Sequence, residues 1–129
     1  MAYPTLRLDG QYTLQRVLTL PNSASTPLVK NKDEGKLVSF AADGSMVLAA
    51  ANAKAFAAVK AVESDGFVSV DFTGVYKVTA SGAIAAGSAV IPSGSNKVKA
   101  VTTENMVTHA VALTPAAADG DIISIFFLN

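Results

Sequence analysis

Few side chains in this sequence could do acid–base, nucleophilic or metal chemistry. The chain has one histidine, His109, and no cysteine. A catalytic pair or triad needs a histidine held by a carboxylate beside a nucleophile, but His109 shares strand parity with Val107 and Val111. This alternation predicts a packed, hydrogen-bonded histidine, so we expect no catalytic residue and no enzymatic activity.

Two short acidic clusters, Asp33-Glu34 and Asp119-Gly-Asp121, are the remaining candidates for metal binding. Neither has the spaced ligands of a calcium loop, and Asp-Gly-Asp at the end of a loop is common turn chemistry. One histidine without thiolates leaves only carboxylates as ligands for a transition metal. The sequence also lacks the glycine patterns that bind phosphates. We therefore expect no metal and no cofactor.

Charge and composition argue against some classes of binding partner. Ten Lys+Arg balance ten Asp+Glu along the 129 residues, which argues against a nucleic-acid partner or an anionic membrane surface. The N-terminus lacks the features of a secretory signal, and no apolar run is long enough to span a membrane. We expect a soluble product of the cytoplasm in which it is made.

Short β-type segments separated by turns fill the second half of the chain, from Asp65 to Asn129. Val68, Val70 and Phe72 share one parity and are expected to point the same way. Ser93-Gly-Ser-Asn96 is a turn signal. This spacing predicts an all-β fold, a small β-barrel or β-sandwich of about seven to eight short strands.

Two segments leave alternatives open. Residues 46–62 are rich in alanine, the best helix former, but they also fit two strands, Met46–Ala50 and Phe56–Val62, joined by a turn at Asn52. The last segment, Ile122–Leu128, is apolar on both faces, which a half-exposed strand is not. It is expected either at the centre of the body or beneath a partner subunit, since a free edge of this composition would aggregate.

The first thirty residues differ from the rest. Leu6 and Leu8 alternate with polar residues, as do Tyr12 and Leu14, and a Pro- and Ser-containing break follows at 21–27. We expect 1–30 to form an extended N-terminal arm or peripheral hairpin, and 31–129 to form the compact β domain.

Seven phrases follow one another in the body, and these are Asp43–Leu48, Ala57–Val62, Gly66–Val70, Gly74–Val78, Ala83–Val90, His109–Leu113 and Gly120–Ile125. In the order and spacing of these phrases, the body resembles the small capsid decoration, or cement, proteins of tailed bacteriophages. In such relatives the phrase at Ala57–Val62 is a strand, so we prefer strands for 46–62. This chain departs from the pattern in its longer, more apolar first thirty residues and in Ser88, where an acidic residue is common.

The resemblance implies a structural virion protein on the capsid exterior. Such proteins, often homotrimers, bind three-fold or quasi-three-fold sites of the expanded capsid and stabilise contacts between major capsid protein subunits. For the contacts with the capsid or between subunits we expect Tyr3, Pro4, Leu6, Leu8, Tyr12, Leu14, Ile123, Ile125 and Phe127. The arm could lie along a neighbouring sheet edge or complete its own barrel, and both roles stay open.

A surface binding module that recognises a glycan or host-surface ligand is the alternative function. Sugar sites use the faces of aromatic rings, and Tyr3, Tyr12, Phe67 and Tyr76 are the candidates.

Overall fold

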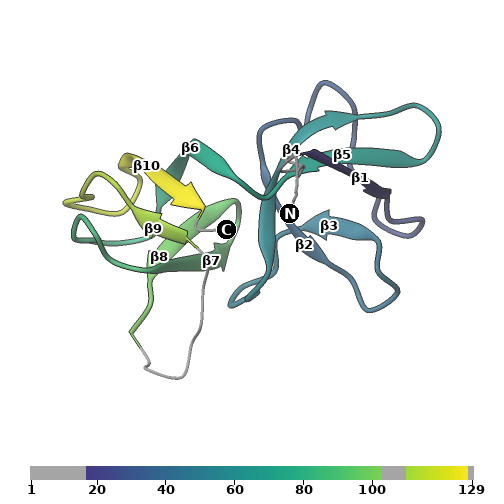
Figure 1. Ribbon diagram of the computed structural model, residues 1–129. Helices are drawn as coiled ribbons and strands as arrows, with labels where there is room; N and C mark the ends of the chain where they lie inside the picture. The colour runs from purple at the N-terminus through teal and green to yellow at the C-terminus, as the bar shows by residue number, and fades with distance from the viewer. Residues whose placement is uncertain (1–16, 103–109, 128–129) are drawn as a thin grey trace, which may run out of the picture.

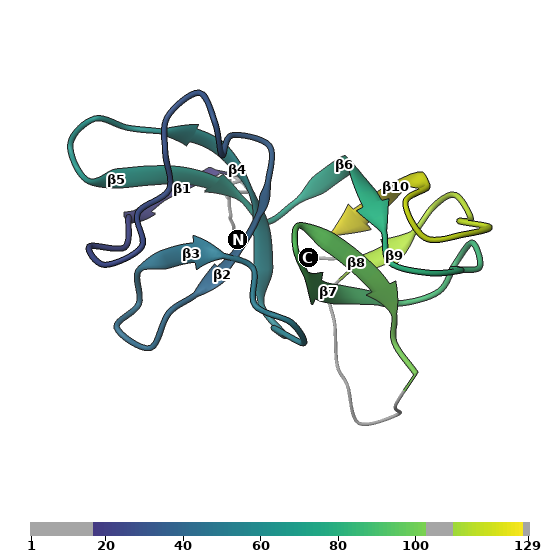
Figure 2. The ribbon, with the colours of Figure 1, turned by 180° about the vertical axis from the view of Figure 1, so that it is seen from behind.

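The structure, a computed structural model, describes residues 17–102 and 110–127. These residues contain ten strands and no helix, which confirms the all-β prediction. The strands form two five-stranded sheets, where the sequence predicted seven or eight strands in one body. Figure 1 shows the two sheets as separate curled units side by side, and Figure 2 shows the same arrangement from behind.

The first unit, here called the N-terminal barrel, holds one sheet in the order β1-β5-β4-β2-β3. Its strands are β1 (Val17–Pro21), β2 (Leu37–Phe40), β3 (Met46–Leu48), β4 (Phe56–Val62) and β5 (Phe67–Asp71). The sheet curls until its edges meet, because Asn22, just after β1, bridges to Met46 of β3. Val38, Met46 and Val70 are fully buried inside it.

The second unit, the C-terminal barrel, holds a sheet in the order β7-β8-β6-β10-β9. Its strands are β6 (Gly74–Ala80), β7 (Val90–Gly94), β8 (Lys97–Ala100), β9 (Ala110–Ala112) and β10 (Ile122–Phe127). The pairing of β6 with β8 is parallel, and the other strand pairs are antiparallel. A bridge between Ala89 and Val111 brings the edge strands together, so this sheet also closes on itself.

Residues 46–62 form strands β3 and β4, which confirms the strand alternative over the helix. Asn52 lies in the connecting turn with a left-handed φ of 64°, a conformation that asparagine tolerates better than most residues. Strand β4 is buried on both faces: Ala57 and Val59 pack inside the N-terminal barrel, whereas Phe56 packs in the core of the C-terminal barrel. Small alanines let a strand fit between two packed layers, so the composition that suggested a helix serves a buried strand.

The two barrels pack against each other along β4. The ring of Phe56 meets the ring of Phe127 edge-on, with centroids 5.3 Å apart. The predicted turn at Ser93–Asn96 is also confirmed, since Asn96 adopts a left-handed φ of 58°. Its side-chain Oδ1 accepts a hydrogen bond of 2.9 Å from the backbone N–H of Leu37 in the other barrel. A shared core and a cross-barrel hydrogen bond therefore join the two units.

The described part of the expected arm belongs to the N-terminal barrel. Strand β1 pairs with β5 over all of its five residues, and the following loop buries Leu28 in the barrel core. The backbone N–H of Leu28 is held by the Asn22 side chain at 2.9 Å. The predicted boundary at residue 30 therefore does not separate two structural units, and the chain changes barrels between β5 and β6 instead.

Candidate binding surface

Strand β10 lies between β6 and β9, so the central position proposed for the last apolar segment is the one observed. Ile123, Ile125 and Phe127 point into the barrel and are at most 1% exposed. A partner could not touch these side chains without opening the barrel. The expectation that these three residues form an interface is corrected accordingly: they form the core.

The other face of β10 is exposed and apolar. Ile122, at 71% exposure, and Phe126 point outward. Phe126 is flanked by Val75 on β6 and by Val111 on β9, its direct cross-strand neighbours. Leu113, just after β9, donates its N–H to the carbonyl of Ser124 at 2.8 Å and is also exposed. We call this surface the outer apolar face, and its residues are Val75, Val111, Leu113, Ile122 and Phe126.

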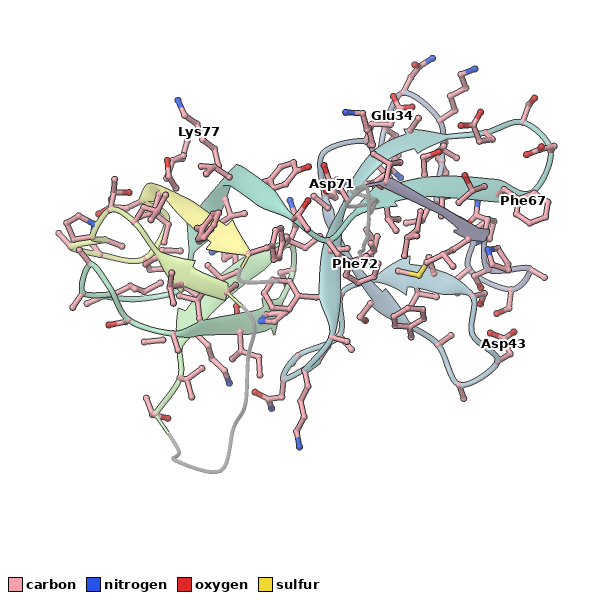
Figure 3. All side chains as sticks on the ribbon, in the orientation of Figure 1. Glu34, Asp43, Phe67, Asp71, Phe72 and Lys77 are labelled. Carbon is pink, nitrogen blue, oxygen red and sulfur yellow. The ribbon has the colours of Figure 1, made fainter. Side chains whose placement is uncertain are left out.

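The outer apolar face carries little polarity. Lys77 and Ser124 are opposite each other in the register of β6 and β10, and Thr79 is opposite Ile122. Lys77 therefore supplies the one charged side chain on β6 and β10 (Figure 3). Val75, Phe126 and Val111 are contiguous across three strands, and Ile122 lies beyond Ser124 on the same face of β10. Exposed apolar surface on a folded chain commonly marks a protein–protein contact.

Exposed apolar side chains of the N-terminal barrel are arranged differently. Leu18, Phe40, Leu48 and Phe67 each stand on a different strand, and no two of them are register partners. Single exposed apolar residues are normal on protein surfaces. The outer apolar face differs because three of its members, Val75, Phe126 and Val111, meet across neighbouring strands.

Sequence reasoning noticed β10 but selected its buried residues. Alternation alone shows that Ile122 and Phe126 share a face; it does not show which face is inward. The contributions of Val75 and Leu113 depend on the pairing of β10 with β6 and β9, which are far apart in the sequence. The sequence signal for this surface was the presence of large apolar residues on both faces of the segment Ile122–Leu128.

The remaining predicted contact residues lie outside the described residues. These are Tyr3, Pro4, Leu6, Leu8, Tyr12 and Leu14. His109 lies outside them as well, so its expected packing is not tested.

The first acidic cluster holds the loop that precedes β2. Asp33 accepts a 2.7 Å hydrogen bond from the backbone N–H of Val29, and it forms a 3.1 Å ion pair with Lys36. The bond from Val29 is the largest influence and lowers the pKa of the Asp33 carboxyl; burial opposes it, and Lys36 reinforces it. The Glu34 carboxylate accepts a 3.1 Å hydrogen bond from the backbone N–H of Val62. Both carboxylates thus serve backbone groups.

A partly open pocket of about 340 Å³ lies beside this loop, between Leu28, Lys32 and Leu48. Its walls are largely aliphatic, and its acidic group, Asp33, is already committed to Val29 and Lys36. Asp33 and Lys36 of this pocket therefore hold the loop in place.

The second acidic cluster is a turn, as predicted. Asp121 accepts hydrogen bonds from the N–H groups of Ala117 at 2.8 Å and Ala118 at 3.1 Å. Asp119 forms an ion pair of 3.4 Å with Lys97 at the surface. Across the described ranges, 17–102 and 110–127, no three His, Cys, Asp or Glu residues are grouped as metal ligands would be.

One buried carboxylate escaped the sequence analysis. Asp71, at the end of β5, is buried beside the crossing between the barrels (Figure 3). The Tyr76 hydroxyl donates to its Oδ2 at 2.5 Å, and Thr73 donates to its Oδ1 through both its N–H and its hydroxyl. Asp71 therefore fixes the turn that carries the chain from β5 into β6.

The aromatic residues proposed for glycan binding are not brought together where they are described. Phe67 begins β5 at the far end of the N-terminal barrel, whereas Tyr76 belongs to β6 of the other barrel (Figure 3). The ring of Tyr76 packs edge-on against Phe127 at 5.7 Å between centroids.

No protein-family model matches this chain, and no curated protein is significantly similar to it. Within the part of the chain that the structure describes, no helix is long and apolar enough to cross a membrane.

Proposed function

We propose that this chain is a capsid decoration protein, a structural virion protein that binds the outside of the expanded capsid of a tailed bacteriophage. In this role it stabilises contacts between major capsid protein subunits at three-fold or quasi-three-fold sites, as a homotrimer. The role is not enzymatic and needs no cofactor. The resemblance in the order of seven sequence phrases suggests it.

The outer apolar face is the observation that carries the proposal. Val75 and Ile122 are 56% and 71% exposed on a sheet whose other face is a packed core. Covering them with a partner removes apolar surface from water, which contributes about 25 cal/mol for each Å² buried. A rigid barrel that presents such a face is suited to packing on another protein.

The proposed selectivity for the expanded shell follows from differential affinity. A protein that binds only one of two states of a shell stabilises that state by its binding free energy. The arm residues expected to contact the capsid, with Leu6, Leu8 and Tyr12 among them, would add to the contact made by the outer apolar face.

Purified protein mixed with expanded and with unexpanded shells of the phage that encodes it tests this proposal. We expect the protein to sediment with the expanded shells alone and to raise their melting temperature. Failure to bind either kind of shell would contradict the proposed function.

A further inference from the structure

The pocket beside the loop that precedes β2 has no part in the proposed function. We propose that it binds the end of a partner polypeptide, an extended segment that carries an aliphatic side chain next to a carboxylate. The pocket lies on β3 and the loop of residues 26–36 in the N-terminal barrel, whereas the outer apolar face belongs to the C-terminal barrel. The two surfaces can therefore serve different partners.

The lining of the pocket fits an aliphatic side chain. Its volume of about 340 Å³ is at the lower end of the roughly 300–1,000 Å³ typical of ligand sites. This size suits a side chain with a short length of backbone better than a cofactor. Val29 and Leu48, two of the lining residues, are 47% and 49% exposed, and Pro27 and Val47 also line the pocket. An aliphatic side chain placed here would remove apolar surface of both partners from water.

The pocket holds one positive charge more than its own ion pair uses. Its charged lining residues are Lys32, Lys36 and Asp33, so two lysines accompany one carboxylate. Asp33 is committed to Lys36 and to the N–H of Val29. Lys32 forms no side-chain hydrogen bond or ion pair with any residue that the structure describes. Its ammonium group is therefore available to a carboxylate of a ligand.

A free strand edge borders the pocket. Ala49 donates its N–H to the carbonyl of Leu37 at 3.0 Å, one residue beyond the register pair of Leu48 and Val38. Because hydrogen-bonded and non-hydrogen-bonded pairs alternate in an antiparallel ladder, Leu48 directs its N–H and C=O away from β2. No described residue pairs with these two groups. An extended segment can add to this edge by main-chain hydrogen bonds while its side chain enters the pocket.

The free edge distinguishes a peptide from a free aliphatic acid as the ligand. Both would use the aliphatic lining and the ammonium group of Lys32. A peptide backbone can in addition accept from the N–H of Leu48 and donate to its C=O. The partner would thus be recognised through its backbone at β3, its side chain in the pocket and its carboxylate at Lys32.

Peptide titration of the full-length protein tests the proposal. The probes are acetyl-Ala-Ala-Val-Leu with a free C-terminal carboxylate, the same peptide with a C-terminal amide, and octanoate. Binding is followed by NMR through the backbone amide shifts of Val29, Lys32 and Leu48. We expect these amides to shift with the carboxylate peptide, which should bind about fivefold more tightly than the amide peptide. Octanoate should bind more weakly than the carboxylate peptide, because it cannot pair with the edge of β3.

Two variants with matched controls locate the site. Lys32→Gln should weaken binding of the carboxylate peptide about fivefold and remove the preference over the amide peptide. Lys54→Gln changes an exposed lysine outside the pocket and should bind like the parent. Leu48→Ser should weaken binding about tenfold, whereas Leu113→Ser, at an equally exposed leucine of the outer apolar face, should not. An unchanged urea midpoint shows that each variant is folded, and Lys32→Gln carries the test if Leu48→Ser is not.

Several results would overturn the proposal. Equal binding of the two peptides, or parent-like binding by Lys32→Gln, would show that the carboxylate is not held at Lys32. Tighter binding of octanoate than of the carboxylate peptide would assign the pocket to a free aliphatic acid. Weaker binding in Leu113→Ser, with shifts on β10 in place of Val29 and Leu48, would place the peptide on the outer apolar face.

Discussion

The two barrels share strand number and all-β architecture but expose different surfaces. The N-terminal barrel spreads its exposed apolar residues singly over four strands and a loop, whereas the four in the C-terminal barrel, Val75, Leu113, Ile122 and Phe126, lie on β6, on β10 or just after β9. The N-terminal core is made of its own residues, and the C-terminal core takes Leu37, Ala49 and Phe56 from its neighbour.

This difference shows how one architecture can serve two purposes. The N-terminal barrel completes the core of its neighbour through Phe56 of β4, and the C-terminal barrel exposes the outer apolar face. A face can stay apolar and exposed without distorting the sheet when the opposite face is held by a well-packed core.

The largest expected effect comes from breaking the shared core. Phe56→Ala removes a fully buried ring that belongs to one barrel by sequence and to the other by packing. We expect a loss of about 3–5 kcal/mol in the free energy of unfolding, measured by urea denaturation, with one transition for the whole chain. Phe67→Ala, on the exposed side of β5, is the control and should change stability by no more than about 0.5 kcal/mol. Two separate transitions in Phe56→Ala would show that the barrels are independent.

A smaller effect is expected at the turn that links the barrels. Asn96→Ala puts alanine in the left-handed region, which asparagine tolerates better, at a cost of about 1 kcal/mol, and it loses the hydrogen bond from the N–H of Leu37, at about 1 kcal/mol. Asn96→Gly keeps the turn and loses only the hydrogen bond. Equal stability of Asn96→Gly and the parent protein in thermal unfolding would mean that this bond does not join the barrels.

The smallest effect is electrostatic and confined to the N-terminal barrel. The N–H of Val29, and after it Lys36, hold the pKa of Asp33 below its ordinary value of 3.8. A carboxyl whose pKa is lowered by folding stabilises the protein above its unfolded pKa, and this contribution is lost as the pH falls through the folded pKa. Asp33→Asn should therefore cost up to about 1 kcal/mol at pH 7.

The pH series supplies the check on Asp33. Urea denaturation of Asp33→Asn and of the parent should converge as the pH falls below 3.8. A difference in stability that persists unchanged at low pH would show that the Asp33 charge is not its cause.

Local features of the fold could be predicted from the sequence, and long-range ones could not. Alternation placed Val68 and Val70 on the same face, and turn chemistry located Asn52 and Asn96, because these depend on near neighbours in the chain. Closure into two barrels depends on which strands pair, and a period of two residues does not specify a partner.

The same limit explains the candidate surface. The sequence showed that Ile122–Leu128 is apolar on both faces, but Val75 joins Phe126 only through the register of β6 with β10. Asp71 was missed for a related reason. Its hydrogen-bond donors, Thr73 and Tyr76, lie beyond the end of β5, so the pattern within this strand does not indicate that Asp71 is buried.

The most direct test of the outer apolar face compares two lysine substitutions on the two barrels. Ile122→Lys and Phe67→Lys each replace an exposed apolar side chain, and both should leave the free energy of unfolding within about 0.5 kcal/mol of the parent. Affinity for expanded shells is then measured by co-sedimentation. We predict that Ile122→Lys weakens binding about tenfold or more, as for a central interface residue, while Phe67→Lys binds like the parent. Parent-like binding by Ile122→Lys, or equal weakening by both variants, would contradict the role assigned to this face.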